Sequence, residues 1–287
     1  MKVRKPVFAG SWYPDSASEC KREIESFLKQ KRFISRLEGE ITAGIVPHAG
    51  WSFSGELACS VFAALSKGAE SKNIDVIVIF GMHMPPGMHP VIMKEGAWGT
   101  PLGTIEVAAE LGESLTSKHP FQVETPDRFA PENTIELQMP LVKYFFDGAK
   151  VLTIGPPAGP EALEIAKTVV KEAERLGLNL IVIGSTDLTH YGANFGFTPA
   201  GSGQSAYEWV RDTNDRRIIE KMLAMDPEGV IEEALLNHNA CCPGATAAAI
   251  AAAKALGAKN AGLLGYASSY ERNPGSTFVG YAGIVYG

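Results

Sequence analysis

The sequence predicts an α/β protein built as a single-domain, three-layer αβα sandwich. Short runs rich in β-branched residues alternate with longer helical stretches along the whole chain. Several of the short runs are apolar at every position, as strands are when helices cover both faces of a sheet. Because no Pro/Gly/Ser-rich linker and no repeat of fixed period divides the 287 residues, we expect one domain over residues 1–287.

The predicted elements follow one another in the order of such a sandwich. Strands are expected at Ile41–Val46, Asp75–Phe80, Val151–Ile154, Leu180–Ile183, Gly262–Tyr266 and Phe278–Val285. Helices are expected at Ala17–Lys31, Gly55–Leu65, Val107–Lys118, Asn133–Phe146, Pro160–Leu176, Ser205–Ala224, Pro227–Asn237 and Gly244–Leu256. Asp15 or Ser16 is expected to cap the first helix, since short polar side chains accept its free N–H groups. Gly68, Gly177 and Gly257 stand where C-terminal caps are expected.

Composition and charge exclude several classes of protein. The 26 Lys and Arg against 32 Asp and Glu give a net charge of −6, which argues against a nucleic-acid binder. No apolar run approaches the roughly 20 residues of a membrane span, so we expect no membrane partner. The basic N-terminus is not followed by a secretory signal pattern, and the four cysteines lack disulfide spacing. A cytoplasmic location is therefore expected, with Cys20 and Cys59 as packing residues on helices.

Three predicted strands are each followed by a side chain that can bind a metal or transfer a proton. His48 lies in Pro47-His48-Ala49-Gly50, His83 in Gly81-Met82-His83, and Asp187 with His190 in Ser185-Thr186-Asp187-Leu188-Thr189-His190. Because ligands of open α/β sheets bind beyond the carboxyl ends of the strands, we expect these side chains on one rim. Each histidine alone more often makes a hydrogen bond in a loop. Asp187 has two possible roles, since its carboxylate can either cap a turn or orient an imidazole.

Two adjacent cysteines, Cys241 and Cys242, precede the alanine-rich last helix. The N-terminus of a helix favours the thiolate form, which both metal binding and nucleophilic attack require. The residues alone leave open a metal site formed by side chains of this rim, and a metal-free hydrolase with Cys241 as nucleophile and His190 as base. Two imidazoles and a thiolate suit Fe(II), Cu or Zn better than Mg or Ca. The sequence has no P-loop, no dinucleotide-binding glycine pattern and no Gly-x-Ser-x-Gly elbow.

Two further segments are candidates for supporting roles. Glu132 and Glu136 lie one helical turn apart and are interpreted either as acidic residues at a helix N-terminus or as a pair of which one, Glu132 or Glu136, reaches the site. The aromatic turn Gly10-Ser11-Trp12-Tyr13-Pro14 is expected to pack at the core or its rim. His238, just before the cysteines, is open between a structural and a supporting role.

These motifs resemble those of one known family. Gly10-Ser11-Trp12-Tyr13, Pro47–Gly50, Glu132–Glu136, Ser185–His190, Ala240-Cys241 and Gly280-Tyr281-Ala282-Gly283 occur in the order of the Memo family (mediator of cell motility; AmmeMemoRadiSam system protein B in prokaryotes). The resemblance spans essentially the whole chain. It implies the fold of class III (LigB-type) extradiol dioxygenases, which hold non-haem Fe(II) with two histidines and a glutamate.

The resemblance also implies roles for particular residues. His48 and His83 match the metal histidines, Cys241 stands where the dioxygenases have their carboxylate, and His190 with Asp187 matches their acid/base group. The family commonly has Gly-Pro-x-His where this chain has Met82-His83-Met84, and usually glycine where this chain has Cys242. Either sulfur is therefore a candidate ligand, and position favours Cys241.

The expected function is a metal-binding protein with a 2-His-1-Cys pocket for Fe(II) or Cu, with Zn also suitable. Whether it is an oxidoreductase of unknown substrate stays open, because a thiolate in place of the carboxylate alters the electronics of the metal. The alternative is a non-catalytic module that recognises a small molecule, a peptide or a partner protein in a vestigial dioxygenase pocket. The resemblance implies radical-SAM and AMMECR1-like proteins as partners.

Overall fold

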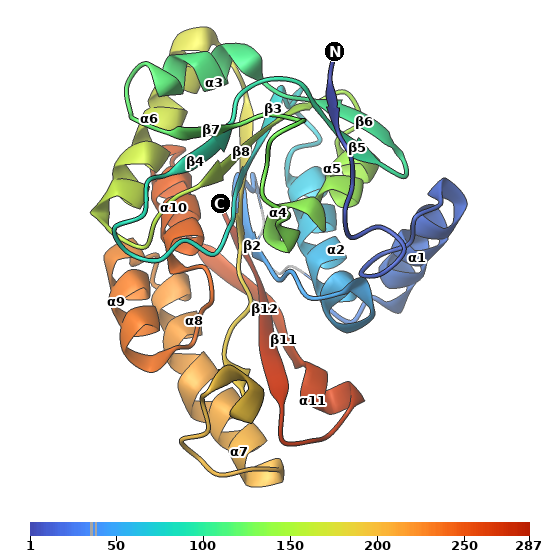
Figure 1. Cartoon of the computed structure of the whole chain (residues 1–287), viewed down its shortest axis with the longest axis vertical. Coiled ribbons are helices and arrows are strands. Elements are labelled where there is room, and N and C mark those ends of the chain that lie inside the picture. Colours follow the sequence, from blue (N-terminus) through green and yellow to red (C-terminus); the bar gives the residue numbers. More distant parts are fainter. Residues whose placement is uncertain (35–36, 38) are drawn as a thin grey trace.

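A central mixed β-sheet with helices on both faces forms the body of the protein, for which a computed structural model describes residues 1–34, 37 and 39–287 (Figure 1). The predicted α/β class is confirmed. That residues 1–287 form one domain stays a prediction. No helix within the described residues is long and apolar enough to cross a membrane.

The described strands form a nine-stranded sheet and a three-stranded sheet. The large sheet has the order β10-β12-β2-β9-β3-β8-β4-β7, and β11 also pairs with β12. Its strands are β2 (Ala43–Val46), β3 (Val76–Phe80), β4 (Val91–Met93), β7 (Gln122–Glu124), β8 (Lys150–Gly155), β9 (Leu180–Ser185), β10 (His190–Tyr191), β11 (Ala261–Ser268) and β12 (Phe278–Tyr286). The small sheet contains β1 (Val3–Arg4), β5 (Ala97–Thr100) and β6 (Gly103–Glu106).

The four strands β2, β9, β3 and β8 lie side by side and parallel at the centre of the large sheet. Apart from Lys150 at the start of β8, all of their residues are buried, which explains why these runs are apolar at nearly every position. All six predicted strands are present, with bounds that differ by up to two residues. The predictions missed the short strands β1, β4–β7 and β10, because two to four residues are too few for a periodic signal.

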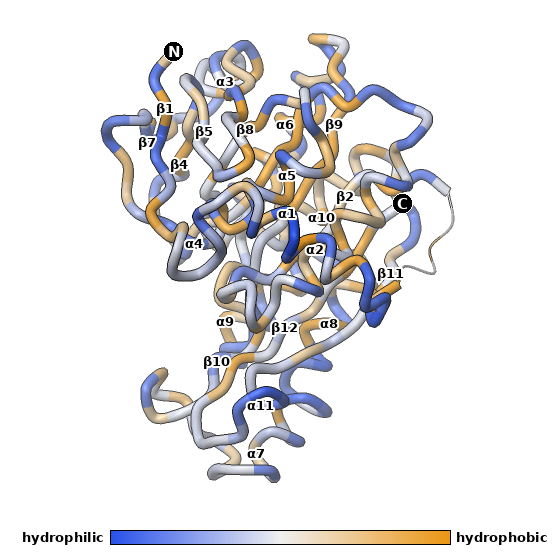
Figure 2. The backbone as a smooth tube through the Cα atoms, turned by 90° about the vertical axis from the view of Figure 1, so that its right-hand side faces the viewer, coloured by the Kyte–Doolittle hydropathy of each residue, from blue (hydrophilic) through white to orange (hydrophobic). Residues whose placement is uncertain are grey.

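Helices cover the two faces of the large sheet (Figure 1). One face carries α1 (Ala17–Gln30), α2 (Trp51–Gly68) and α5 (Met139–Phe145), and the other α3 (Ala109–Thr116), α6 (Pro160–Leu176), α8 (Asp215–Leu223), α9 (Pro227–Asn237) and α10 (Pro243–Ala255). The short helices α7 (Gln204–Trp209) and α11 (Ser269–Arg272) lie at one end of the molecule. Figure 2 shows hydrophobic residues concentrated on the central strands and α10.

The alanine-rich α10 packs directly on β9 and β2 and is buried along most of its length. A methyl group added to Gly184 of β9 would lie 2.8 Å from Cβ of Ala249, so the glycine permits the close approach. Small residues on both sides therefore bring the N-terminus of α10 against the carboxyl edge of the sheet.

Two predicted helices are interrupted. The stretch Asn133–Phe146 divides into α4 (Asn133–Glu136) and α5, because Pro140 has no N–H to donate to the carbonyl of Glu136. The stretch Ser205–Ala224 contains a π-helical turn at Val210–Asn214 between α7 and α8. The bounds of α6 and α9 are the predicted ones.

The helix caps differ from the predictions at one glycine. Ser16 rather than Asp15 caps α1, since its hydroxyl accepts from the backbone N–H of Glu19. Gly177 and Gly257 adopt positive φ values of 68° and 94°, as expected after a helix end. The prediction for Gly68 was wrong: it is the last helical residue, and a Cβ there would meet Ile41 at 2.8 Å, so it serves close packing.

Candidate metal centre

The carboxyl edge of the parallel strands holds the cluster of histidine and cysteine side chains. His48 follows β2, His83 follows β3, and β9 lies between these two strands in the sheet. Cys241 and Cys242 enter from the N-terminus of α10. The metal-binding atoms of these four residues all lie within 4.8 Å of one another. The structure therefore brings together the three predicted ligands and adds the second sulfur.

Hydrogen bonds on both sides hold the imidazole of His48. Its Nδ1 lies 3.0 Å from Oγ of Ser185, and that hydroxyl donates to the carbonyl of Thr134 at 2.7 Å. Because a carbonyl only accepts, Ser185 uses its proton there and accepts the Nδ1 proton of His48. Nε2 of His48 is then the ring nitrogen that faces the cluster, and it lies 3.3 Å from Sγ of Cys241. The protein thus orders the imidazole as a metal ligand requires.

Cys241 is the thiolate of the pair. Burial by itself raises the pKa of this thiol, but a hydrogen bond with Cys242, the positive charge of His48 and hydrogen bonds with both histidines outweigh it. The pKa of Cys241 consequently lies well below its usual range. The backbone N–H of Asp187 also donates to Sγ of Cys241 at 3.3 Å. Burial and the neighbouring Cys241 raise the pKa of Cys242, which is therefore a neutral thiol beside the thiolate.

His83 reaches the cluster from a strained turn. Met82 before it has a left-handed φ of 69°, and its N–H donates to Oγ1 of Thr134 at 2.6 Å. The side chain of His83 is 44% exposed, and its Nδ1 lies 3.5 Å from Oε1 of Glu132. Hydrogen bonds with Cys241 and Glu132 raise the pKa of His83. A non-glycine residue held in this conformation is common where a side chain must be aimed at a functional site.

Asp187 connects the cluster to His190. Its Oδ1 accepts from the backbone N–H of His48 at 2.7 Å, and its Oδ2 lies 3.9 Å from Nε2 of His190. That separation is too long for a hydrogen bond, and Nε2 of His190 is buried without a partner among the described residues. The geometry does not favour the hydrolase hypothesis, because the imidazoles that contact Cys241 are those of His48 and His83.

A cavity of about 660 Å³ opens in front of the cluster. His83, His190 and Cys241 face it, and Phe195 places its ring 4.9 Å from that of His190. No Lys, Arg, Asp or Glu is among the described residues that line it. Most of its lining is apolar: Met84, Pro85, Pro86, Ala158, Leu188, Phe195, Phe197, Ala234, Leu235, Ala240 and Pro243.

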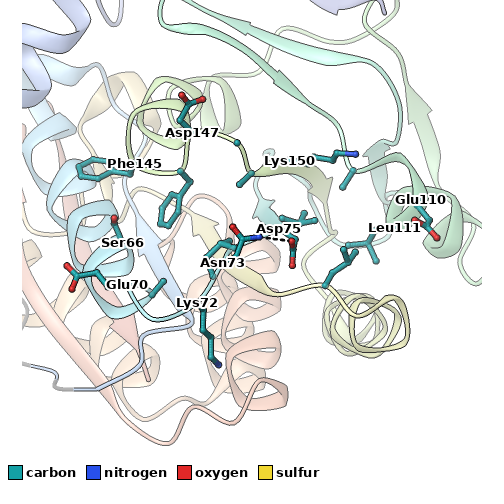
Figure 3. A pocket seen from close by; sticks show the side chains of 18 of the residues that line it. Ser66, Glu70, Lys72, Asn73, Asp75, Glu110, Leu111, Phe145, Asp147 and Lys150 are labelled. Carbon is teal, nitrogen blue, oxygen red and sulfur yellow. Dashed lines mark hydrogen bonds between the residues drawn. The ribbon is translucent and has the colours of Figure 1, made fainter.

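A second cavity of about 600 Å³ lies at the opposite edge of the sheet, by the amino ends of β3 and β8 (Figure 3). Asn73, Asp75 and Lys150 are among its lining residues, and the Asn73 amide donates to Asp75 at 3.1 Å. No described histidine or cysteine lines it. The chemistry of the side chains therefore points to the first cavity.

Of the two acidic candidates, only Glu132 reaches the cluster. Glu132 caps α4 through the N–H of Thr134 and pairs with His83. Oε1 of Glu136 instead accepts the N–H groups of Val7 and Phe8 and the hydroxyl of Tyr13. Of the alternatives Glu132 or Glu136, it is therefore Glu132 that reaches the cluster, and the side chain of Glu136 anchors the N-terminal segment.

The remaining candidates have structural surroundings. Tyr13 of the aromatic turn is buried as expected. His238 ends α9 in a left-handed conformation and lines the cavity. Cys20 and Cys59 are fully buried in the core, as predicted for packing residues.

The polar residues that order the loop of His48 were not predicted from the sequence. Ser185 and Thr134 form the chain of hydrogen bonds behind His48, while Asn133 donates to the carbonyl of His48 at 3.1 Å. Gln138 donates to the carbonyl of Pro47 at 3.0 Å. Within Glu132–Glu136, the side-chain amide of Asn133 and the backbone carbonyl of Thr134 make these contacts rather than the carboxylates.

Fold and site together define an α/β protein that gathers histidine and cysteine side chains at the carboxyl edge of a parallel sheet. The family described as Memo-like protein matches residues 4–285. A MEMO1 family protein of Pyrococcus furiosus is 33% identical over 299 residues, covering 99% of this chain and 98% of its own. One from Methanopyrus kandleri is 34% identical over 295 residues, with 99% and 98% covered. The chain therefore belongs to the Memo family.

The fold is shared more widely than the sequence. The crystal structure of an uncharacterised protein from Escherichia coli K12 matches with a TM-score of 0.50 at 9% identity. The match covers 86% of this chain and all of that one. It supports the α/β architecture and carries no information on function.

Proposed function

We propose that this Memo family protein binds a transition metal through His48, His83 and Cys241, with Fe(II) or Cu as the expected ions and Zn also suited. The observation that carries the proposal is the convergence of these donor atoms, from three distant segments, within 4.8 Å. Two imidazoles and a thiolate form a ligand set of intermediate softness, which suits these ions better than Mg or Ca.

The spacing of the donors fits such an ion. Metal–nitrogen bonds of about 2.0–2.1 Å and metal–sulfur bonds of about 2.3 Å place neighbouring tetrahedral ligands about 3.4–3.8 Å apart. Sγ of Cys241 and Nε2 of His48 are 3.3 Å apart. Cys241 is already a thiolate, and Nε2 of His48 already faces it, so the metal would displace the proton that the imidazole shares with the thiolate. Little rearrangement is therefore needed for binding.

An oxidoreductase activity is the catalytic form of this proposal, in which the bound metal supplies redox chemistry. His190 would exchange a proton with a molecule in the cavity, since its Nε2 is unpartnered and the side chain lines that space. Asp187 would orient the imidazole of His190 during this exchange. Its Oδ2 lies 3.9 Å from Nε2 of His190, so the side chains would have to move closer to form a hydrogen bond.

The apolar lining of the cavity favours a second candidate function, a module that binds a partner without turnover. Phe195 and Leu235 at the cavity are 45% and 46% exposed, and most of the described residues that line it are apolar. Such a surface suits an apolar peptide side chain or an uncharged small molecule. The radical-SAM and AMMECR1-like partners implied by the resemblance stay proposals, which titration with the purified proteins would test.

The test of the metal proposal is anaerobic purification followed by elemental analysis. The native chain is expected to carry about one metal ion per molecule, whereas His48→Ala and Cys241→Ser should carry almost none. Cys59→Ser is the matched control, because Cys59 is a buried cysteine of the core. Full retention of metal by His48→Ala and Cys241→Ser would refute the assignment.

A further inference from the structure

We propose that Cys242 is a fourth ligand of this centre, so that the site holds a tetrahedral ion with two sulfur and two nitrogen ligands. The inference rests on the proposed metal binding and narrows it to Zn(II), because a closed set of two thiolates and two imidazoles is the ligand set of tetrahedral zinc. Iron with reactive open positions would instead use only three protein ligands.

The two sulfurs already stand at the spacing of a shared ion. A tetrahedral ion with metal–sulfur bonds of about 2.3 Å separates its two sulfur ligands by about 3.8 Å. Sγ of Cys241 and Sγ of Cys242 are 3.6 Å apart. The Cys242 sulfur also belongs to the group whose donor atoms lie within 4.8 Å of one another.

The backbone explains how two consecutive residues present their sulfurs to one point. In an extended chain, neighbouring side chains point to opposite sides. Cys242 lies at the turn into α10, with φ −127° and ψ 62°, and its N–H donates to Oγ1 of Thr186 at 3.1 Å. The N–H of Cys241 donates to the carbonyl of Asp187 at 3.1 Å. These two bonds tie the cysteine pair to the loop after β9.

The surroundings of Cys242 leave its sulfur one polar neighbour. The side chain is 1% exposed, and the sulfur of Cys241 is the hydrogen-bonding partner found for it among the described residues. By contrast, Cys20 and Cys59 direct their sulfurs to the backbone carbonyls of Pro14 and Ile24. Cys242 therefore differs from the packing cysteines of this chain in facing other metal-binding atoms.

Binding changes the protonation of this residue in a defined way. The thiol of Cys242 gives its proton to solvent as its sulfur forms the bond to Zn(II), and no electron is transferred. A coordinating thiol is deprotonated by the charge of the ion even when burial opposes ionisation. With four protein ligands the coordination is complete, so a molecule in the cavity would contact His190 and the apolar wall rather than the ion.

The test uses the full-length metal-free chain, loaded with Zn(II) in competition with a chelator and examined by X-ray absorption. The native protein should show two sulfur and two nitrogen neighbours. Cys242→Ala should show one sulfur and bind Zn(II) more than about 100-fold more weakly, since even an indirect contact to a ligand is worth 10–100-fold. Cys59→Ala is the matched control and should bind as the native chain does.

A native spectrum with one sulfur neighbour, or Zn(II) affinity of Cys242→Ala within threefold of native, would overturn the inference. The native spectrum alone decides the question should Cys242→Ala fail to fold. If Cys241→Ala and His48→Ala also bind Zn(II) as tightly as the native chain, the proposed metal site itself is wrong. That outcome is distinct, because the loss of Cys242 as a ligand leaves binding by the other three.

Discussion

Replacement of Ser185 by alanine tests how the protein orders the imidazole of His48. Oγ of Ser185 accepts the Nδ1 proton of His48 at 3.0 Å and donates to the carbonyl of Thr134 at 2.7 Å. Ser185→Ala removes both bonds while deleting a single oxygen atom. The imidazole then loses the contact that keeps the proton on Nδ1 and Nε2 free for the metal.

The expected loss follows from the burial of the pair. His48 is 2% exposed, so water cannot replace the missing partner easily, and an unpaired buried N–H costs about 1–3 kcal/mol. Partners of ligating histidines are typically worth about 10–100-fold in metal affinity, or roughly 1.4–2.7 kcal/mol. We therefore expect Ser185→Ala to bind Zn(II) or Fe(II) about 10–100-fold more weakly than the native chain does.

Chelator competition under anaerobic conditions measures the affinity, and urea denaturation of the metal-free protein measures stability separately. Ser268→Ala is the matched control, because Ser268 is also a buried serine with two hydrogen bonds, to Val279 and Tyr270, at the start of α11. Affinity of Ser185→Ala within threefold of native would refute the role of the hydroxyl. An equal loss in Ser268→Ala would show that stability rather than ordering of His48 is responsible.

Three further predictions concern stability. Burial raises the pKa of Asp215 to about 7 from 3.8, so between these values the folded chain keeps a proton that the unfolded chain has lost. The contribution of this group to the free energy of unfolding therefore falls as pH rises from about 4 to 7, by up to roughly 1.4 kcal/mol per pH unit. Asp215→Asn should remove this pH dependence, which urea titrations at several pH values would measure. Arg4→Met should destabilise the fold by about 3–5 kcal/mol, because it leaves the buried Glu124, 2.8 Å away, without its counter-charge. Gly244→Ala should cost about 1–3 kcal/mol, since its Cβ would lie 2.5 Å from the carbonyl oxygen of Pro156.

Each of these has a clear contrary result in denaturation experiments. An unchanged pH slope in Asp215→Asn would show that another group carries the dependence. A loss below about 1 kcal/mol for Arg4→Met would contradict a buried, unpaired Glu124, and Arg4→Met with Glu124→Leu should recover much of the stability. Native stability of Gly244→Ala would mean that the start of α10 can move away from the loop after β8.

Much of the candidate site was predictable from the order of residues along the chain. His48, His83 and Asp187 each follow an apolar strand, and parallel strands deliver their carboxyl ends to one edge. Cys241 and Cys242 stand just before an alanine-rich helix with a proline at its first position. These patterns are local, because they depend only on residues that are close together along the chain.

Other features depend on contacts between distant residues. Nothing beside Ser185 in the chain indicates that its hydroxyl bonds Thr134, which is 51 residues away. The choice between Glu132 and Glu136 could not be predicted, because the N–H groups that bind the Glu136 carboxylate belong to Val7 and Phe8, 129 and 128 positions away. The π-helical turn at Val210–Asn214 buries Asn214, which bonds Thr189, and no periodicity marks it.

The chain's order of apolar and polar residues was enough to assign the α/β class, the central strands and the residues with metal-binding chemistry, because periodicity and side-chain chemistry are local properties. Whether two sulfurs and two imidazoles share one centre could be learned only once the strands and α10 were packed together. Coordination depends on separations of a few ångströms between segments up to 193 residues apart, and tertiary packing alone sets such separations.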